Sequence, residues 1–296
     1  MEDKKITIKD ILEKKKSGQK ITMLTAYDYP LASLIDRAGI DIILVGDSLA
    51  NVVLGLESTT QVGMAEMIHH SKAVARAVKS AMVVGDMPYE SYQINPDDSV
   101  NPVRKSTPSA VEGIISNGVK NARRFIDEAN CDAVKLEWFD KCLEVSEAIL
   151  KSGIQVMGHI GLTPQTADKL GGFKVQGRDA EQAKRLIKQA QDLEGIGCFS
   201  IVLECVPDKI AEIITHKLKI PTIGIGAGVN CDGQVLVTHD LLGLFERFKP
   251  KFVKQYVNLS SEILKAVQDY KSEVLEGRFP TKEHSFTIKQ EELKKL

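Results

Sequence analysis

The sequence has no apolar run that approaches the ~20 residues needed to span a bilayer, and its first ten residues, MEDKKITIKD, contain no apolar signal-peptide core. Its 296 residues include 39 Lys and Arg against 40 Asp and Glu, so no excess of charge predicts a nucleic-acid or membrane-surface partner. The five cysteines are odd in number and scattered, with no Cys-x-x-Cys pair, which argues against disulfides or a zinc site. We therefore expect a cytoplasmic protein with free thiols.

Short apolar runs that end in a polar residue recur along the chain. The clearest is DIILVGDS, residues 41–48, which reads as a strand buried on both faces and ends in Gly46, Asp47 and Ser48. Later runs carry Asp86, then Lys135 with Glu137, then His159, and then Glu204. Strands that repeatedly deliver one polar group at their carboxyl end are typical of the active-site rim of a parallel α/β barrel.

Eight such strands alternate with amphipathic helices over nearly the whole chain, which predicts a parallel sheet. The length fits a single (β/α)8 TIM barrel of ~250 residues. A doubly wound open sheet is the competing fold, but no Gly-x-Gly-x-x-Gly follows the first predicted strand. We expect one domain over residues 1–296, with an N-terminal capping helix in segment 1–19 and an extended loop inserted at 93–109 after strand three. A C-terminal helix and tail should occupy residues 250–296, where apolar residues at helical spacing predict a helix over 253–274.

Three acids end successive predicted strands: Asp47, Asp86 and Glu137. In a barrel these strands are neighbours, so the carboxylates can meet, and a divalent cation would offset their mutual repulsion. Hard oxygen ligands with open water positions suit Mg²⁺. The alternative for each acid alone is a helix cap or an arginine partner. Three acids on successive strands favour the metal site.

The other polar residues at the strand ends each allow two interpretations. Lys135 points to the same side as Glu137, where it either holds a substrate oxygen or pairs with that acid. His159 is either a core donor or a ligand contact. Glu204 ends a very apolar strand, where desolvation raises a carboxyl pKa and makes a usable general base, unless it only caps the next helix.

A metal ion and a base at one rim suit proton abstraction next to a carbonyl. The cation would hold a 2-oxo acid and stabilise the enolate that forms when Glu204 removes a proton. Composition and spacing predict metal-assisted enolisation and do not identify the substrate.

Nine short sequence motifs, in order along a match from about residue 6 to residue 286, resemble the ketopantoate hydroxymethyltransferase family. They are LTAYD (24–28), VGDS (45–48), KLE (135–137), GHIGLTPQ (158–165), GGFKVQGR (171–178), VLECVP (202–207), IPTIGIGAG (220–228), DGQVLV (232–237) and EHSF (283–286). Each motif is modest evidence alone, whereas the ordered series is specific.

The resemblance implies a (β/α)8 barrel that transfers a hydroxymethyl group from 5,10-methylenetetrahydrofolate to 3-methyl-2-oxobutanoate. The product is 2-dehydropantoate, a precursor of pantothenate and coenzyme A. The family forms large homo-oligomers, commonly decamers. The resemblance implies that Asp47 and Asp86 bind Mg²⁺, with Glu137 near the metal mainly through water. It implies that Ser48, Lys135 and His159 contact the oxo acid beside the two aspartates. It also implies that Glu204 is the catalytic base.

The chain departs from the family pattern at two places. The loop at 93–109 is longer than expected and is either a lid over Asp86 or a surface insertion. Trp138, Phe139 and Asp140 stand where glycines are expected, and Trp138 is either a folate-stacking platform or a packing residue.

Two rival functions remain open from the sequence. One is a Mg²⁺-dependent 2-oxo-acid carbon–carbon lyase of the isocitrate-lyase and phosphoenolpyruvate-mutase kind. Such enzymes usually carry a cysteine in a catalytic loop, and the comparable stretch here, residues 171–178, has none. The other is a non-catalytic barrel whose rim acids only stabilise the fold.

Overall fold

The structure is a computed structural model that describes residues 4–93, 108–166 and 174–296. The predicted lid or insertion at 93–109 lies almost wholly outside the described residues, as does the first part of the glycine-rich stretch at 171–178.

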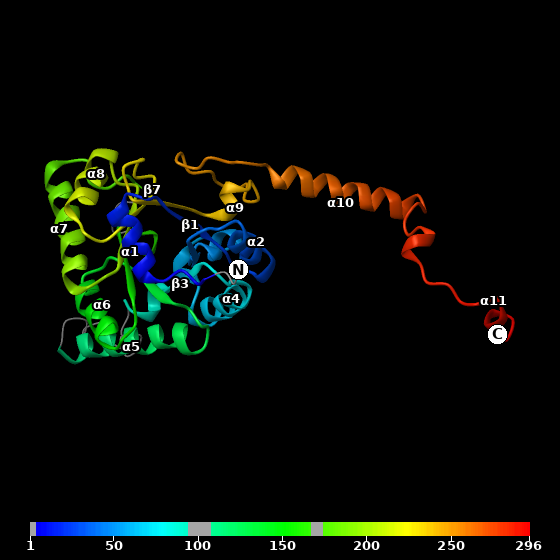
Figure 1. Cartoon of the computed structure of the whole chain (residues 1–296), viewed down its shortest axis with the longest axis horizontal. Coiled ribbons are helices and arrows are strands. Elements are labelled where there is room, and N and C mark those ends of the chain that lie inside the picture. Colours follow the sequence, from blue (N-terminus) through cyan, green and yellow to red (C-terminus); the bar gives the residue numbers. More distant parts are fainter. Residues whose placement is uncertain (1–3, 94–107, 167–173) are drawn as a thin grey trace. The chain divides into compact units, whose positions relative to one another are not determined.

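Eight parallel strands close into a barrel in sequence order (Figure 1). They are β1 (Ile21–Thr25), β2 (Ile42–Val45), β3 (Met82–Asp86), β4 (Ala133–Glu137), β5 (Val156–Gly161), β6 (Ser200–Glu204), β7 (Thr222–Ile225) and β8 (Gly233–Leu236). β1 pairs with both β2 and β8, which closes the sheet. The predicted (β/α)8 barrel is confirmed.

Helical segments precede and follow the strands, and the helices that follow a strand cover the outside of the barrel. The helical segments are α1 (Ile8–Ser17), α2 (Tyr29–Arg37), α3 (Leu49–Val52), α4 (Met64–Ala77), α5 (Pro108–Asp127), α6 (Cys142–Lys151), α7 (Ala180–Ile196) and α8 (Asp208–Lys217), with short 3₁₀ turns η1 (Thr59–Gln61) and η2 (Tyr89–Ser91). Close helix–strand packing requires glycine at one position of β3. A Cβ on Gly85 would lie 2.3 Å from the ring of Phe125 in α5.

Helix α1 closes the amino-terminal end of the barrel, as predicted. Thr7 and Asp10 form a capping box at its start, and Gly18 ends it with a left-handed φ of 72°. Ile11 is fully buried in the same cluster as the inward-facing strand residues Ile21 and Met82. This apolar plug leaves the carboxyl ends of the strands as the open rim.

Strand register sets the functional side chains at one level. Asp86 lies opposite Lys135, Glu137 opposite His159, and Gly161 opposite Glu204. Because side chains alternate in direction along a strand, Lys135, Glu137 and His159 point into the barrel with the interior cluster.

The chain divides into two compact units, one of Met1–Thr238 with Lys251–Val253 and one of His239–Pro250 with Lys254–Leu296. Our expectation of a single domain stays a prediction. The second unit holds most of α9 (Thr238–Leu241), then α10 (Leu259–Leu275), a 3₁₀ turn at Lys282–His284 and α11 (Gln290–Leu293). Among the described residues, no helix has the length and apolar character that crossing a membrane requires.

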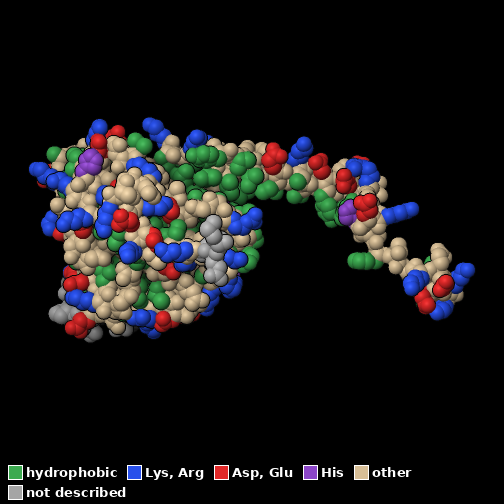
Figure 2. All heavy atoms as spheres, viewed as in Figure 1, with side chains coloured by type: hydrophobic (Ala, Val, Ile, Leu, Met, Phe, Trp, Pro, Cys, Tyr) green, Lys and Arg blue, Asp and Glu red, His purple; other side chains and the backbone are tan. Residues whose placement is uncertain are grey.

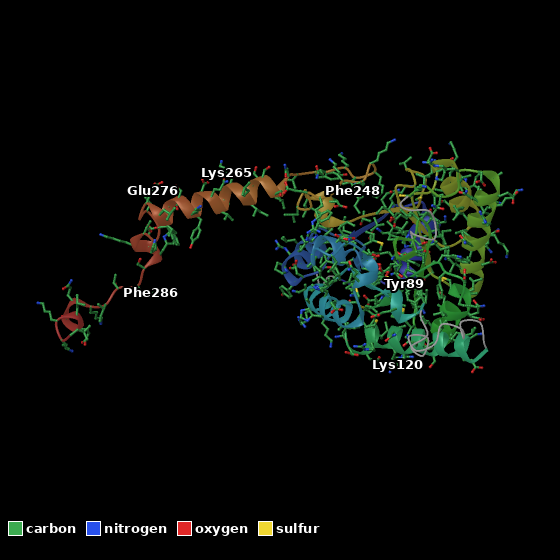
Figure 3. The ribbon with its side chains drawn as sticks, turned by 180° about the vertical axis from the view of Figure 1, so that it is seen from behind. Tyr89, Lys120, Phe248, Lys265, Glu276 and Phe286 are labelled. Carbon is green, nitrogen blue, oxygen red and sulfur yellow. The ribbon has the colours of Figure 1, made fainter. Side chains whose placement is uncertain are left out.

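The predicted start of the final helix at residue 253 is wrong. Helix α10 begins at Leu259, because the Asn258 side chain caps it by accepting a hydrogen bond from the Ser261 N–H. Val253 belongs to the barrel unit, where it is buried. No residue of α10 is buried, and hydrophobic side chains gather along it (Figure 2). Lys265 lies within α10 and Glu276 directly follows its last turn (Figure 3).

Candidate active site

The carboxyl rim of the barrel gathers the predicted polar residues into one cluster. Asp86 and Glu204 are the last residues of β3 and β6, Lys135 and Glu137 lie in β4, and His159 lies in β5. Asp47 follows β2 by two residues, and its backbone N–H donates to the Asp86 carboxylate at 3.2 Å. None of these side chains except Glu204 belongs to a residue more than 5% exposed. Ser48 is half-buried, and its hydroxyl lies 2.8 Å from that of Tyr27.

Asp86 and Lys135 form a buried ion pair. The Lys135 ammonium donates to both carboxylate oxygens of Asp86 at 2.7 Å. Burial alone would lower the lysine pKa, but Asp86, Glu137 and Asp47 outweigh it and raise the pKa above its ordinary value. Lys135 therefore stays charged, which provides fixed positive charge at the rim. One interpretation of the sequence was an ion pair between Lys135 and Glu137. In the structure, the ion-pair partner of Lys135 is Asp86 instead.

His159 lies between two carboxylates. Its Nδ1 is 3.5 Å from Glu137 Oε1 and its Nε2 is 3.3 Å from Glu204 Oε2. Neither ring nitrogen makes a well-formed hydrogen bond within the described residues. Burial and Lys135 lower the pKa of the imidazole, but Glu137 and Glu204 outweigh them and raise it to about 9. The ring is thus a cation beside the carboxylate of the predicted base.

Gln165 connects the acids, and our sequence reasoning gave it no role. Its side-chain amide donates to Asp47 Oδ2 at 2.9 Å, and its backbone N–H donates to Glu137 Oε2 at 3.0 Å. Its side-chain oxygen accepts from the Tyr92 hydroxyl at 2.7 Å, and that hydroxyl accepts from the Glu137 N–H at 3.0 Å. Burial and Glu137 raise the pKa of Tyr92 well above its usual range, so the phenol stays a donor. Gln165 is the last residue of the family motif GHIGLTPQ, and this position in the motif was the sequence signal that could have indicated a role.

The net charge of the cluster is negative enough to bind a divalent cation. Four carboxylates, those of Asp47, Asp86, Glu137 and Glu204, face one lysine and one histidine. With every group ionised, two negative charges are unbalanced, which is the charge that one Mg²⁺ neutralises. Burial, and then repulsion from Asp86 and Glu137, raises the pKa of Asp47 well above its ordinary value.

The donor set fits Mg²⁺ with water and substrate oxygens completing its shell. Within the described ranges, no group of three His, Cys, Asp or Glu side chains is arranged to hold a metal by itself. Mg²⁺ is commonly held by one or two carboxylates and keeps several waters. Asp47 and Asp86 supply two such carboxylates. Both oxygens of Glu137 already face Gln165 and His159, which is consistent with an indirect contact.

Comparison with known proteins shows the family of the chain. The family model for ketopantoate hydroxymethyltransferase matches residues 5–112 and 107–282. The chain belongs to the ketopantoate hydroxymethyltransferase family. It is 52% identical over 292 residues to the 3-methyl-2-oxobutanoate hydroxymethyltransferase of Syntrophomonas wolfei subsp. wolfei, covering 99% of each chain. It is 50% identical over 281 residues to the protein of that name in Desulfotalea psychrophila, covering 95% of this chain and 94% of the relative. The predicted family and the prediction of a transferase enzyme are confirmed, which sets the non-catalytic barrel aside.

Solved structures resemble the fold at low identity. A phosphonopyruvate hydrolase in complex with oxalate and Mg²⁺ matches with a TM-score of 0.56 at 11% identity, covering 94% of this chain and 93% of that chain. A phosphoenolpyruvate phosphomutase from Streptomyces platensis subsp. rosaceus matches with a TM-score of 0.54 at 13% identity, covering 90% and 88%. These likenesses support the barrel fold that the hydroxymethyltransferase family shares with them and carry no argument about activity.

Proposed function

We propose that the protein converts 3-methyl-2-oxobutanoate, 5,10-methylenetetrahydrofolate and water into 2-dehydropantoate and tetrahydrofolate, as a step of pantothenate biosynthesis in the cytoplasm. Membership of the family supports the oxo acid and the hydroxymethyl transfer, because the names of the relatives state both. The observation that carries the mechanism is the position of Glu204, whose carboxylate lies 3.3 Å from His159 at the same rim as the aspartates.

In this mechanism Glu204 removes the proton from C3 of the oxo acid. Water adds to the methylene carbon of the folate, and its two carbon–nitrogen bonds break with one proton going to each nitrogen. The enolate adds to the formaldehyde-level carbon that is released, and the new alkoxide takes the proton that Glu204 holds, so the hydroxyl oxygen comes from water. A Mg²⁺ ion held by Asp47 and Asp86 would polarise the 2-oxo group and stabilise negative charge on its oxygen.

The remaining residues orient the acid and its base. Lys135 pairs with Asp86 and places positive charge where the oxygens of the oxo acid would lie. Protonated His159 holds Glu204 by charge, and a substrate oxygen that approaches Nε2 would share its N–H with that carboxylate. Ser48 offers one more hydroxyl beside Asp47.

Product formation tests the proposal directly. The purified protein is incubated with both substrates and Mg²⁺, and 2-dehydropantoate is measured by mass spectrometry, with each component omitted in turn. We expect product only in the complete mixture. The absence of product there would refute the activity. Product without the folate would refute the donor.

We also propose that the protein is a homo-oligomer, with a decamer as the family resemblance implies. The outward side chains of six strands are buried, but Thr22 and Leu24 of β1 and Gln234 and Leu236 of β8 are exposed or half-buried. Within the barrel unit, the outside of β1 and β8 is therefore less covered than the outside of the other strands.

Helix α10 carries the complementary surface. Ile263, Val267, Tyr270 and Val274 form one stripe at helical spacing, and each is 44–58% exposed. Apolar stripes of this kind are costly to leave in water. We propose that α10 of a second copy covers the outer face of β1 and β8.

Sedimentation velocity tests this assembly on the full chain. We expect a mass of several 32.6-kDa chains for the wild type and a smaller mass for Val267→Glu. Lys265→Glu is the control and should keep the wild-type mass, because a residue two positions before Val267 lies on the opposite side of α10. A monomeric wild type would refute the oligomer, and an unchanged mass for Val267→Glu would refute the role of α10.

A further inference from the structure

A cavity of about 320 Å³ opens beside the catalytic cluster. Its walls come from the segment after β4, with Trp138 and Phe139, from the last residue of β5, Gly161, and from α7, with Arg185 and Gln189. This space is roughly ten times the ~30 Å³ that one water molecule occupies in the liquid, so it admits a ring system.

The cavity adjoins the predicted base through one backbone contact. Gly161 lines the cavity and lies opposite Glu204 in the β5–β6 register. The next residue, Leu162, donates its N–H to the Glu204 carbonyl at 2.8 Å. Gly161 has a φ of 98°, and a Cβ there would lie 2.3 Å from that carbonyl oxygen, so only glycine allows the approach. A molecule in the cavity would therefore lie beside the β6 backbone that carries Glu204.

The lining combines aromatic faces with uncompensated polar groups. Trp138 and Phe139 are half-buried, and the Phe139 ring is held edge-on against Tyr92 at 5.3 Å between centroids. Arg185 makes no ion pair or hydrogen bond with the described part of the chain, although it lines the cavity. Asp140 lines it too and is also exposed.

This set of groups matches a folate more closely than a small oxo acid. A pterin is a flat ring system that stacks on an aromatic side chain, and its amide and amine edge donates to a carboxylate such as that of Asp140. The benzoylglutamate end of a folate carries carboxylates, which an unpaired guanidinium binds in bidentate fashion.

We propose that this cavity is the folate subsite of the enzyme, with Trp138 as the stacking platform and Arg185 as a carboxylate contact. The inference rests on the proposed function, because it takes the one-carbon donor to be a folate. It assigns a binding role to the Trp-Phe-Asp sequence that stands where glycines are expected.

The chain offers a direct probe, because Trp138 is its single tryptophan. The wild-type protein is titrated with 5-formyltetrahydrofolate while tryptophan fluorescence is recorded, with N-acetyltryptophanamide correcting for absorption by the ligand. We expect saturable quenching. Arg185→Ala should weaken the apparent affinity about tenfold or more, as expected for the loss of a charged contact. Lys184→Ala removes a cation from the adjacent position of α7, outside the cavity lining, and should bind as the wild type does.

Calorimetry and kinetics extend the test to Trp138 itself. Trp138→Ala should raise both the Kd and the KM for the folate, and Trp138→Phe should restore most of the affinity because it keeps an aromatic face. Folate-free, Mg²⁺-dependent deuterium exchange at C3 of the oxo acid should be unchanged in these variants. This exchange also shows whether a variant is folded.

The outcomes separate the two proposals. Wild-type folate affinity and KM in both Arg185→Ala and Trp138→Ala, with product still formed, would overturn the subsite and leave the reaction intact. No quenching in a wild-type protein that forms product would do the same. A wild type without exchange or product would overturn the proposed function instead.

Discussion

Replacing Glu204 with Gln tests the assignment of the base with little change in shape. An amide cannot accept the C3 proton, so the rate of exchange should fall ~10²–10⁴-fold, which corresponds to about 3–5 kcal/mol of transition-state stabilisation. The fold should survive, because the hydrogen bonds of this segment use backbone atoms, from Leu162 N–H to the Glu204 carbonyl and from Cys205 N–H to the Ile225 carbonyl. The oxo acid should still bind, because Asp47 and Asp86 are unchanged.

The assay is loss of the C3 proton signal of 3-methyl-2-oxobutanoate in deuterated buffer with Mg²⁺, followed by NMR. Glu137→Gln is a matched control, since Glu137 lies 3.5 Å from the other nitrogen of the same imidazole. Both oxygens of Glu137 are engaged, so at saturating Mg²⁺ its variant should lose less than about tenfold. Equal exchange by Glu204→Gln and the wild type would refute the role of Glu204, as would a larger loss in Glu137→Gln.

Three further predictions concern packing, the buried network and the thiols. Gly85→Ala should lower the free energy of unfolding by about 1–3 kcal/mol or more, because its Cβ would lie 2.3 Å from the phenyl ring of Phe125 in α5. Gly195→Ala, at a helical position with nothing within 4 Å, should raise the free energy of unfolding by about 0.5–1 kcal/mol. Urea unfolding measures both variants, and the opposite order of stability would contradict this packing. Tyr92→Phe should cost about 1–3 kcal/mol in the same assay, because it leaves the Glu137 N–H without its acceptor, and a neutral effect would show that water replaces the hydroxyl. Burial, with a further effect of the Glu204 charge, raises the pKa of the Cys205 thiol to about 12, so only about one thiol in 10⁴ is ionised at pH 8. We therefore expect Cys205 to react slowly with Ellman's reagent in the native protein, and we expect five reactive thiols after denaturation. A fast reaction of Cys205 in the native protein would contradict the raised pKa.

The barrel was predictable because strands buried on both faces are apolar throughout and are therefore easy to recognise. The run before Asp47 and the run ending at Asp86 are both fully buried strands in the structure. The same property places the acids, because parallel strands that close into a barrel present their carboxyl ends at one rim.

The connections within the rim were not predictable from the same pattern. Gln165 lies after β5, is 118 residues from Asp47 and 73 from Tyr92, and has no periodicity that marks it. The pairing of Lys135 with Asp86, rather than with Glu137 on the same strand, depends on the register between β3 and β4. Neither the register nor a loop path follows from hydrophobic spacing alone.

The start of the last helix was misplaced for a related reason. Val253 continues the apolar spacing of α10, but it is buried in the barrel unit, and Asn258 starts the helix. Spacing identifies an apolar face, and it does not say which unit buries each residue.

The most direct test of the account is a crystal of the protein grown with 3-methyl-2-oxobutanoate and Mn²⁺ in place of Mg²⁺, measured for anomalous scattering. We predict one strong peak that contacts Asp47, Asp86 and two oxygens of the oxo acid, with Glu204 facing C3. A bound oxo acid with no peak at these aspartates, or with its C3 turned away from Glu204, would contradict the central claim.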